Sequence, residues 1–159
     1  MSVRSGIGWD SHRLEAGRRL IIGGVELEYD RGLAGHSDGD VLTHAVMDAL
    51  LGAAGCGDIG QWFPDTDPRY KDADSIALLR LLVAEMEARG IRPTHCDTTV
   101  MMEQPKLSPH REAIRESLAG GLKLPFDAVN VKASTGERMG FVGRGEGVAA
   151  LAIVTVDAA

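Results

Sequence analysis

Residues 148–156 read VAALAIVTV and are apolar at almost every position. Successive side chains of a strand point to opposite faces of a sheet, so a strand that is apolar on both faces is expected to be covered on both. The run therefore predicts a strand inside a sheet. If helices cover only one face of that sheet, we expect another subunit to cover the other face.

Segments near the N-terminus predict further strands. Residues 3–10 alternate with the two-residue period of a strand, which places Asp10 and, if the strand continues, His12 on one face. In residues 19–29, RLIIGGVELEY, two apolar-rich arms flank a Gly–Gly pair. Because glycine readily adopts the positive φ of a tight turn, this segment predicts a hairpin.

Three further segments are predicted helices, and the first two have the apolar spacing of an amphipathic helix. Ser37 with Asp40 predicts the start of the first helix, and Gly55 predicts its end. Ser108 and Pro109 predict the start of the third. The predicted helices cover residues 37–54, 74–89 and 108 to the Gly120–Gly121 pair, and further strands are expected at residues 95–102 and 128–133.

Strands and helices thus alternate along the chain, but not as regular parallel crossovers. The hairpin and a glycine-rich loop between the last two strands interrupt that pattern. We predict an α+β fold with a mixed β-sheet, helices packed on one face and a small β-hairpin. The length of 159 residues suits one domain, residues 1–159.

The composition excludes several classes of function. A net charge of −6 and a pI near 5.3 argue against non-specific nucleic-acid binding, which requires an excess of Lys and Arg. Cys56 and Cys96 have no metal-binding or redox spacing, so we expect both to be core thiols in a reducing cytoplasm. The N-terminus does not resemble a signal peptide, and no run approaches about 20 apolar residues. We therefore expect a cytoplasmic protein outside the membrane.

Two histidines and an aspartate form the first candidate site. Asp10-x-His12 at a strand end and His44 on the first helix offer a ligand set that suits Zn²⁺. Three protein ligands would leave a position open for a Lewis-acid role on a phosphoryl oxygen. Asp40 and Asp48 lie four residues on either side of His44, so either could orient its imidazole. The alternative is a chance Asp-x-His and a surface histidine.

Two segments around the first helix are candidates for substrate binding. Residues 36–40, HSDGD, place His36 and Ser37 before a helix N-terminus, where an anion such as phosphate is favoured. An ordinary N-cap explains Ser37 equally well. The acidic, proline-containing residues 57–75 are either a lid over substrate or a solvated connection. Their spacing does not match an EF-hand loop.

The last candidate is residues 129–147, VNVKASTGERMGFVGRGEG. Glycine lets a backbone approach a phosphate closely, and Ser134 and Thr135 offer hydroxyl groups. Glu137 could hold Mg²⁺ or Mn²⁺ on a diphosphate. The glycine order is neither a P-loop nor a dinucleotide-binding fingerprint, and no helix is expected to follow. The alternative is a flexible hairpin loop, and for Lys106 a solvated charge competes with a phosphate contact.

Taken in order, three stretches resemble the cyclodiphosphate synthase family. They are GWDSHRL at 8–14, IIGGVELEYDRGLAGHSDGDVLTHAVMDALLGAAGCGDIGQWFPDTDP at 21–68, and VNVKASTGERMGFVGRGEGVAA at 129–150. The resemblance covers nearly the whole chain. It implies a lyase of the non-mevalonate isoprenoid pathway. The implied substrate is 4-diphosphocytidyl-2-C-methyl-D-erythritol 2-phosphate, whose 2-phosphate attacks the β-phosphate to form a cyclic diphosphate and release CMP.

The same resemblance implies roles for individual residues. Asp10, His12 and His44 would bind one divalent metal ion per subunit, usually zinc. Glu137 would bind a second ion, Mg²⁺ or Mn²⁺, on the substrate diphosphate. The residues implied to stabilise the transition state are His36 and Thr135. The residues implied to bind substrate are Asp10, His12, His36, Ser37, Asp58, Ile59, Gly60, Phe63, Asp65, Asp67, Met102, Lys106, Leu107, Ser108, Ala133, Ser134, Thr135, Glu137, Phe141 and Arg144.

The resemblance also implies an assembly. Members of the family are homotrimers with active sites between adjacent subunits, and the central cavity is a candidate site for an isoprenoid diphosphate. Gly136 stands where the family commonly has a hydroxyl residue, so only its two neighbours are expected to donate hydroxyls. Two other functions stay open, namely a metal-dependent phosphoesterase that activates water and a non-catalytic nucleotide-binding module.

Overall fold

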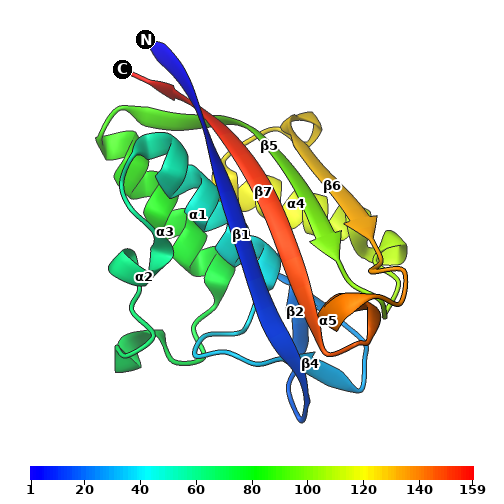
Figure 1. Cartoon of the computed structure of the whole chain (residues 1–159). Coiled ribbons are helices and arrows are strands. Elements are labelled where there is room, and N and C mark those ends of the chain that lie inside the picture. The colour runs from blue at the N-terminus through cyan, green and yellow to red at the C-terminus, as the bar shows by residue number, and fades with distance from the viewer.

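The computed structural model describes residues 1–159 of the chain. Five strands form one mixed sheet in the order β4-β1-β7-β5-β6, and only β5 and β6 pair in parallel (Figure 1). Their bounds are β1 Ser2–Ala16, β4 Arg31–Leu33, β5 Ile91–Met101, β6 Val129–Ser134 and β7 Gly147–Ala158, and a separate hairpin pairs β2 Leu20–Ile22 with β3 Val25–Leu27. The predicted α+β fold with a mixed sheet and a hairpin is confirmed.

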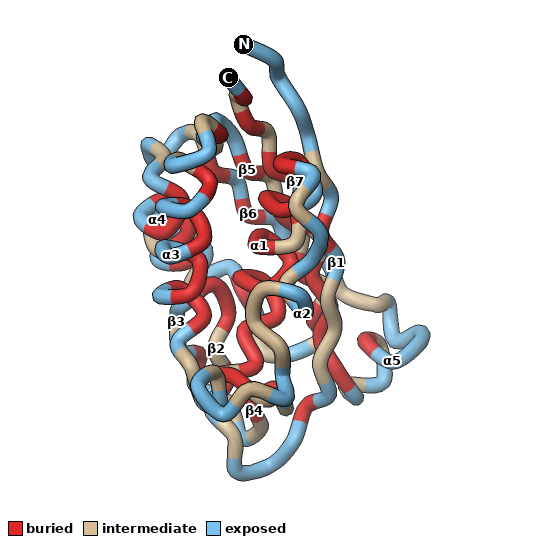
Figure 2. Tube along the Cα trace, turned by 90° about the vertical axis from the view of Figure 1, so that its left-hand side faces the viewer, coloured by how far each residue is buried: buried red, intermediate tan, exposed pale blue.

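The longer helices lie together on one face of the sheet (Figure 1). The helices are α1 Val41–Ala54, α2 Ile59–Trp62, α3 Ser75–Ala88, α4 Arg111–Leu122 and α5 Gly140–Gly143, with 3₁₀ turns at Pro68–Tyr70, Ser108–His110 and Phe126–Ala128. Buried residues follow α1 and the sides of α3 and α4 that face it (Figure 2). None of the helices combines the length and the apolar character that crossing a bilayer demands.

Helix α1 lies directly on β1 because β1 lacks side chains where the two elements meet. A Cβ atom added at Gly8 would lie 1.8 Å from the Ala45 carbonyl oxygen, and one added at Gly6 would lie 2.1 Å from another α1 carbonyl oxygen. Both distances are far below van der Waals contact. Because side chains alternate along a strand, Asp10 and His12 face α1 as well.

The three long helices leave the opposite face of the sheet uncovered (Figure 1), and this face carries exposed apolar side chains. Ile7 is 65% exposed and Trp9 is 54% exposed. Ile7 lies opposite the exposed Ile153 of β7, and Trp9 lies opposite Leu151. Soluble proteins seldom leave such a patch open to water unless it binds something. The covering of this face by another subunit stays a prediction.

Helix α1 begins later than the sequence predicted. Asp40, not Ser37, is the N-cap, and Val41 is the first helical residue. The buried Asp40 carboxylate accepts from the backbone N–H and the hydroxyl of Thr43, at 3.0 and 2.7 Å. It also accepts from the two glycine N–H groups of the β2–β3 turn, at 2.8 and 2.7 Å. One carboxylate thus caps α1 and fixes the hairpin turn, which leaves the buried start of α1 closed to an anion.

Helix α4 and the glycine-rich loop also differ from the prediction. The helix does not stop at Gly120 but continues through Gly121 to Leu122, and Lys123, with a φ of 57°, ends it. A Cβ atom at Gly121 would lie 2.9 Å from the Leu79 side chain of α3. Glycine therefore serves helix packing at this position. The loop expected without a helix contains α5.

Candidate metal centre and active site

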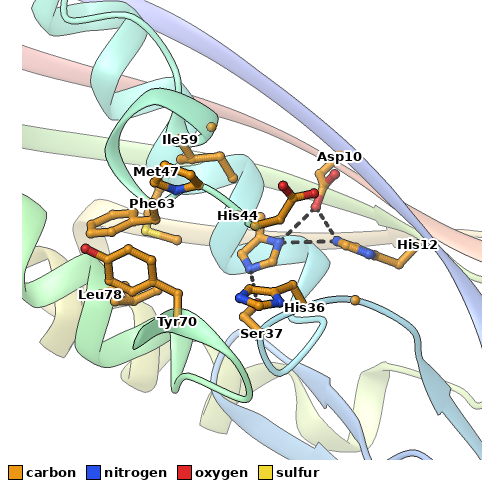
Figure 3. A pocket seen from close by; sticks show the side chains of 14 residues that line it. Asp10, His12, His36, Ser37, His44, Met47, Ile59, Phe63, Tyr70 and Leu78 are labelled. Atoms are coloured by element: carbon orange, nitrogen blue, oxygen red, sulfur yellow. Dashed lines mark hydrogen bonds and ion pairs between the residues drawn. The ribbon is translucent and has the colours of Figure 1, made fainter. Parts of the chain in front are cut away.

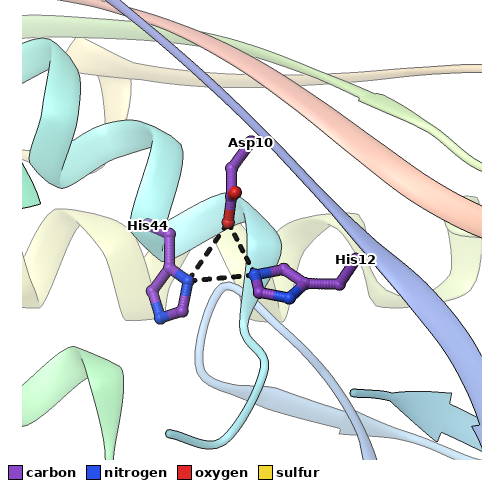
Figure 4. A group of neighbouring side chains, drawn as sticks. All are labelled: Asp10, His12 and His44. Atoms are coloured by element: carbon purple, nitrogen blue, oxygen red, sulfur yellow. Dashed lines mark hydrogen bonds and ion pairs between the residues drawn. The ribbon is translucent and has the colours of Figure 1, made fainter. Parts of the chain in front are cut away.

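The three predicted metal ligands converge on one point (Figure 4). Asp10 Oδ2 lies 2.7 Å from His12 Nε2 and 3.1 Å from His44 Nδ1, and the two ring nitrogens are 3.2 Å apart. No other three His, Cys, Asp or Glu side chains of the chain come together in this way. The close contact of β1 with α1 produces the group, because it brings His44 within reach of the β1 side chains.

The donor set and its dimensions fit a divalent cation. In a tetrahedral zinc site, ligand atoms about 2.0–2.1 Å from the metal lie about 3.3 Å from one another. The observed separations of 2.7 to 3.2 Å would need to widen by roughly 0.1 to 0.6 Å. Two imidazoles and one carboxylate favour zinc or a similar ion over Mg²⁺ and Ca²⁺, which prefer oxygen ligands.

The charges of the group also suit a cation. Burial alone would raise the pKa of Asp10, but hydrogen bonds from His12 and His44, together with their charges, lower it to about 2. The carboxylate is therefore ionised near neutral pH. Burial alone would lower the pKa of His44, but the hydrogen bond to Asp10 and the charges of nearby aspartates raise it. Metal binding at His44 Nδ1 would therefore release a proton.

Neither aspartate that was predicted to orient His44 has its carboxylate hydrogen-bonded to the His44 imidazole. Asp40 caps α1, and Asp48 Oδ1 accepts at 2.8 Å from a backbone N–H of α2. His44 Nε2 instead lies 3.0 Å from the hydroxyl oxygen of Ser37 and 3.0 Å from that of Ser75. Ser75 begins α3, and because it is 31 residues from His44 no sequence spacing could have pointed to it.

A cavity of about 400 Å³ opens beside the three ligands (Figure 3). Predicted site residues that line it are Asp10, His12, His36, Ser37, His44, Ile59, Gly60, Phe63 and Asp65. Pro64 and Tyr70, which lie in the candidate segment 57–75, also line it, and the lining residues that no candidate site segment included are Gly35, Met47 and Leu78. Met47 lies three residues after His44, so helical spacing could have identified it. The structure thus brings the metal group together with most of the substrate-binding residues predicted between His36 and Asp67.

The acidic segment 57–75 forms one wall of this cavity. His36 Nε2–H donates to the Asp67 carbonyl oxygen at 2.9 Å, and the rings of Phe63 and Tyr70 pack edge to face with centroids 5.2 Å apart. Neither Asp58 nor Asp67 lines the cavity. The Asp67 carboxylate is paired with an arginine, and Asp58 caps α2. The segment is more than a solvated connection, and its closure as a lid stays a prediction.

A second cavity, of about 170 Å³, lies where β5 and β6 end. The predicted site residues that line it are Met102, Lys106, Leu107, Ser108, Ala133, Ser134 and Thr135, and Pro105 and Arg111 complete it. Because β5 and β6 are parallel neighbours, their following segments leave the sheet at the same end. Glu103 holds the two segments together, since its Oε1 accepts from the Gly136 N–H at 2.8 Å.

The two cavities are well separated within one chain. Asp10 lies on β1, and Thr135 follows β6; β7 and β5 lie between these strands. Three strand spacings of about 4.8 Å place them roughly 14 Å apart across the sheet. The metal group and the predicted diphosphate loop therefore do not meet in a single subunit.

Besides Asp58 and Asp67, three predicted residues lie outside both cavities. Glu137 is exposed, with a φ of 53°, and its N–H donates to the Thr135 hydroxyl at 3.2 Å. Arg144 pairs with Glu146 at 2.9 Å. Phe141 lines a third cavity, of about 200 Å³, whose walls are shared with the β1 strand. The single chain therefore assigns these residues no common site.

Comparison with known proteins agrees with this fold. The YgbB family model matches residues 3–157. A 2-C-methyl-D-erythritol 2,4-cyclodiphosphate synthase of Salinibacter ruber is 57% identical over 157 residues, which is 99% of this chain and 100% of that relative.

Two solved structures share the fold. The bifunctional IspDF from Campylobacter jejuni matches with a TM-score of 0.93 and 41% identity, over 98% of this chain and 42% of that chain. A 2C-methyl-D-erythritol-2,4-cyclodiphosphate synthase in its CDP-bound form matches with a TM-score of 0.88 and 42% identity, over 97% of this chain and 100% of that chain. With nearly its whole length matched in sequence and in fold, the chain belongs to the YgbB family.

Proposed function

We propose that this chain converts 4-diphosphocytidyl-2-C-methyl-D-erythritol 2-phosphate into 2-C-methyl-D-erythritol 2,4-cyclodiphosphate and CMP. The observation that carries the proposal is the convergence of Asp10, His12 and His44 beside a cavity of about 400 Å³. In this reaction an oxygen of the 2-phosphate forms a bond to the β-phosphorus. The bond from that phosphorus to the oxygen bridging the α-phosphate breaks, and CMP leaves with the bridging oxygen.

The metal group would act on the phosphates. A bound divalent cation, which the two imidazoles favour as zinc, would polarise a phosphoryl oxygen and offset the repulsion between the two reacting anions. Asp10, His12 and His44 would hold that cation with its open side toward the cavity. His36 uses its Nε2–H in the hydrogen bond to Asp67, so it would donate Nδ1–H to the substrate as the imidazolium, which also brings a positive charge to the phosphates.

The two cavities would hold opposite ends of one substrate. The cavity at the metal group would take the methylerythritol phosphate half, near Ser37 and the residues after Ile59. The smaller cavity would take the cytidine, with Lys106 toward the phosphates. Holding nucleophile and leaving group of one molecule in an attacking geometry can supply several kcal/mol of the barrier reduction, so no protein nucleophile is needed.

The complete site would form between subunits of a homotrimer. The roughly 14 Å between the two cavities of one chain supports this arrangement, as does the uncovered apolar face of the sheet. Thr135 of one subunit would then meet the metal group of its neighbour. Glu137 would hold Mg²⁺ or Mn²⁺ together with the diphosphate, since Mg²⁺ is often bound through one carboxylate and substrate phosphates. The interior of the trimer would be the candidate site for an isoprenoid diphosphate.

Product identification tests the function. We expect ³¹P NMR of the reaction mixture to show CMP and a cyclic diphosphate in equal amounts. A metal-dependent phosphoesterase using the same ligands would activate water instead, and it would give free phosphate or a linear product. A spectrum with only hydrolysis products would overturn the proposal in favour of that second candidate.

A further inference from the structure

The side of His44 that faces away from the metal group has its own hydrogen-bonded partners. Nδ1 faces Asp10 and His12, whereas Nε2 lies 3.0 Å from Ser37 Oγ and 3.0 Å from Ser75 Oγ. A neutral imidazole that binds a metal through one nitrogen carries its proton on the other. The partners of Nε2 therefore decide whether Nδ1 is free to bind a cation.

Ser75 is committed to an aspartate behind it. Its hydroxyl oxygen lies 2.5 Å from Asp38 Oδ1, and its backbone N–H donates to Asp38 Oδ2 at 2.9 Å. An ionised carboxylate only accepts hydrogen bonds, so the single hydroxyl proton of Ser75 points to Asp38. Ser75 Oγ can then only accept from His44, which requires the proton to be on Nε2.

We propose that Asp38 acts through Ser75 as a positioning residue for the metal centre. The pair holds the His44 proton on Nε2 and directs the Nδ1 lone pair to the cation. This inference rests on the proposed function, because it concerns the same metal group. It extends that proposal to two residues, neither of which lines the metal cavity.

Burial strengthens the hydrogen-bonded chain from Asp38 through Ser75 to His44, which we call the relay. Ser75 is fully buried and His44 nearly so, so water does not compete for these hydrogen bonds. Ser75 is the first residue of α3 and His44 lies within α1, so the packing of these helices fixes the distance between the two side chains. Ser37 differs from Ser75, since no carboxylate accepts its hydroxyl proton among the hydrogen bonds of the chain. Its hydroxyl can rotate to donate or to accept.

Zinc affinity measured by competition with a chromogenic chelator tests the relay. We expect Ser75→Ala and Asp38→Asn each to weaken zinc binding by about 10- to 100-fold, as is typical when a partner of a ligating histidine is removed. Ser37→Ala is the matched control. It removes a hydroxyl at the same distance from Nε2 that no carboxylate orients, so we expect a smaller loss of zinc affinity than in Ser75→Ala.

A double-mutant cycle separates the relay from a general structural effect. If Asp38 acts through Ser75, the Ser75→Ala/Asp38→Asn double variant binds zinc about as well as Ser75→Ala alone. In the zinc-loaded wild-type protein, we also expect a downfield His44 Nε2–H proton signal that is protected from exchange, and Ser75→Ala should shift it upfield or lose it. Additive losses in the cycle, or affinities of both single variants within twofold of wild type, would overturn the relay.

Further outcomes distinguish this inference from the proposed function. If Ser75→Ala does not fold, Asp38→Asn decides alone, and an unchanged zinc affinity in that variant overturns the relay. If His44→Ala loses zinc while Asp38→Asn and Ser75→Ala keep it, the relay fails and the proposed metal centre stands. If His44→Ala binds zinc as tightly as wild type, the metal centre itself fails, and the relay fails with it.

Discussion

Aspartates close together in the sequence take different roles around the metal group. Asp38 accepts from Ser75, Asp40 caps α1 and binds the hairpin turn, and Asp48 accepts from a backbone N–H of α2. Only Asp10 faces the cation position. The role of each carboxylate is decided by the donors that the fold brings to it, because a buried carboxylate needs hydrogen-bond partners.

The two cysteines should differ in reactivity. Cys96 is buried, and burial, with a smaller contribution from the adjacent Asp97 carboxylate, raises the pKa of its thiol to about 12. At pH 8 only roughly one molecule in ten thousand would carry the reactive thiolate at that pKa. Cys56 is only half-buried, so it is not the core thiol that the sequence predicted.

We therefore expect one thiol per chain to react with a chromogenic disulfide reagent in the native protein, and two in denaturant. Cys56→Ser should abolish the native reaction, and Cys96→Ser should leave it unchanged. Two rapidly reacting thiols in the native protein would contradict the burial of Cys96.

Residue types and spacing made Asp10, His12 and His44 a candidate metal-binding set, and the family resemblance implied the same three residues. The two-residue period of β1 predicted that Asp10 and His12 share a face, and the structure has both facing α1. The contact of His44 with Ser75 could not be predicted, because it joins helices whose packing the sequence pattern does not encode. The roles of His36, Thr135 and Glu137 came from the family resemblance and stay predictions.

At the scale of elements, the β1–α1 contact determines the precision of the site. Gly6 and Gly8 let the helix backbone approach the strand, and His44 reaches Asp10 as a result. Asp40 then fixes the N-terminal end of the same helix relative to the hairpin. A metal group built on two packed elements is held more rigidly than one built on loops.

Removing the Asp40 carboxylate should weaken the fold. Asp40→Ala loses the α1 cap and leaves four donors without a partner, two of them in the hairpin turn. We expect the free energy of unfolding to fall by about 3 kcal/mol, from the cap and the unpaired buried donors together. Urea unfolding at fixed protein concentration measures it.

Asp40→Asn is the matched control for this prediction. The amide keeps one acceptor oxygen and the same shape, so we expect a smaller loss than for Asp40→Ala. Equal stability of Asp40→Ala and wild type, within about 0.5 kcal/mol, would show that the carboxylate does not hold the two elements together.

Periodicity predicted the elements better than their ends. The hairpin, the predicted strands and the three long helices occur where the sequence placed them, whereas the short strand β4 was not predicted. The resemblance to the cyclodiphosphate synthase family is confirmed. The predicted start of α1 was wrong because more hydrogen-bond donors surround the Asp40 side chain than the Ser37 side chain, and Asp40 is the N-cap. The predicted end of α4 was wrong because the sequence pattern takes Gly121 for a helix stop, whereas in the structure this glycine allows close contact with Leu79.

At the scale of the whole molecule, two features of the chain support the proposed assembly of identical subunits. Its two cavities lie on separate parts of the sheet, and apolar side chains such as Ile7 and Trp9 stay exposed. Both features are expected of a subunit whose site and core are completed by identical neighbours. The apolar pattern of β7 predicted from sequence that both faces of the sheet are apolar. The separation of the two cavities could be recognised only from the order of the strands in the structure.

Mixing inactive variants tests the site between subunits. His44→Ala and Thr135→Ala should each be nearly inactive, because each damages one half of every site. If the halves come from different subunits, co-refolding equal amounts should restore about one quarter of wild-type activity through random assembly. Measurement of CMP release before and after mixing checks this.

The control mixture combines two variants damaged in the same half. His44→Ala with Asp10→Ala should remain inactive, because no pairing of subunits rebuilds the metal group. Should the first mixture also stay inactive although trimers form, the site would lie within one chain.

The most direct measurement is the zinc content and CMP release of folded His44→Ala beside wild type. We predict about one zinc per wild-type subunit, and in His44→Ala the loss of most of the metal and nearly all CMP release. His110→Ala, a histidine outside both cavities, should keep the metal and the activity. Full zinc occupancy in folded His44→Ala would contradict a metal centre formed by Asp10, His12 and His44.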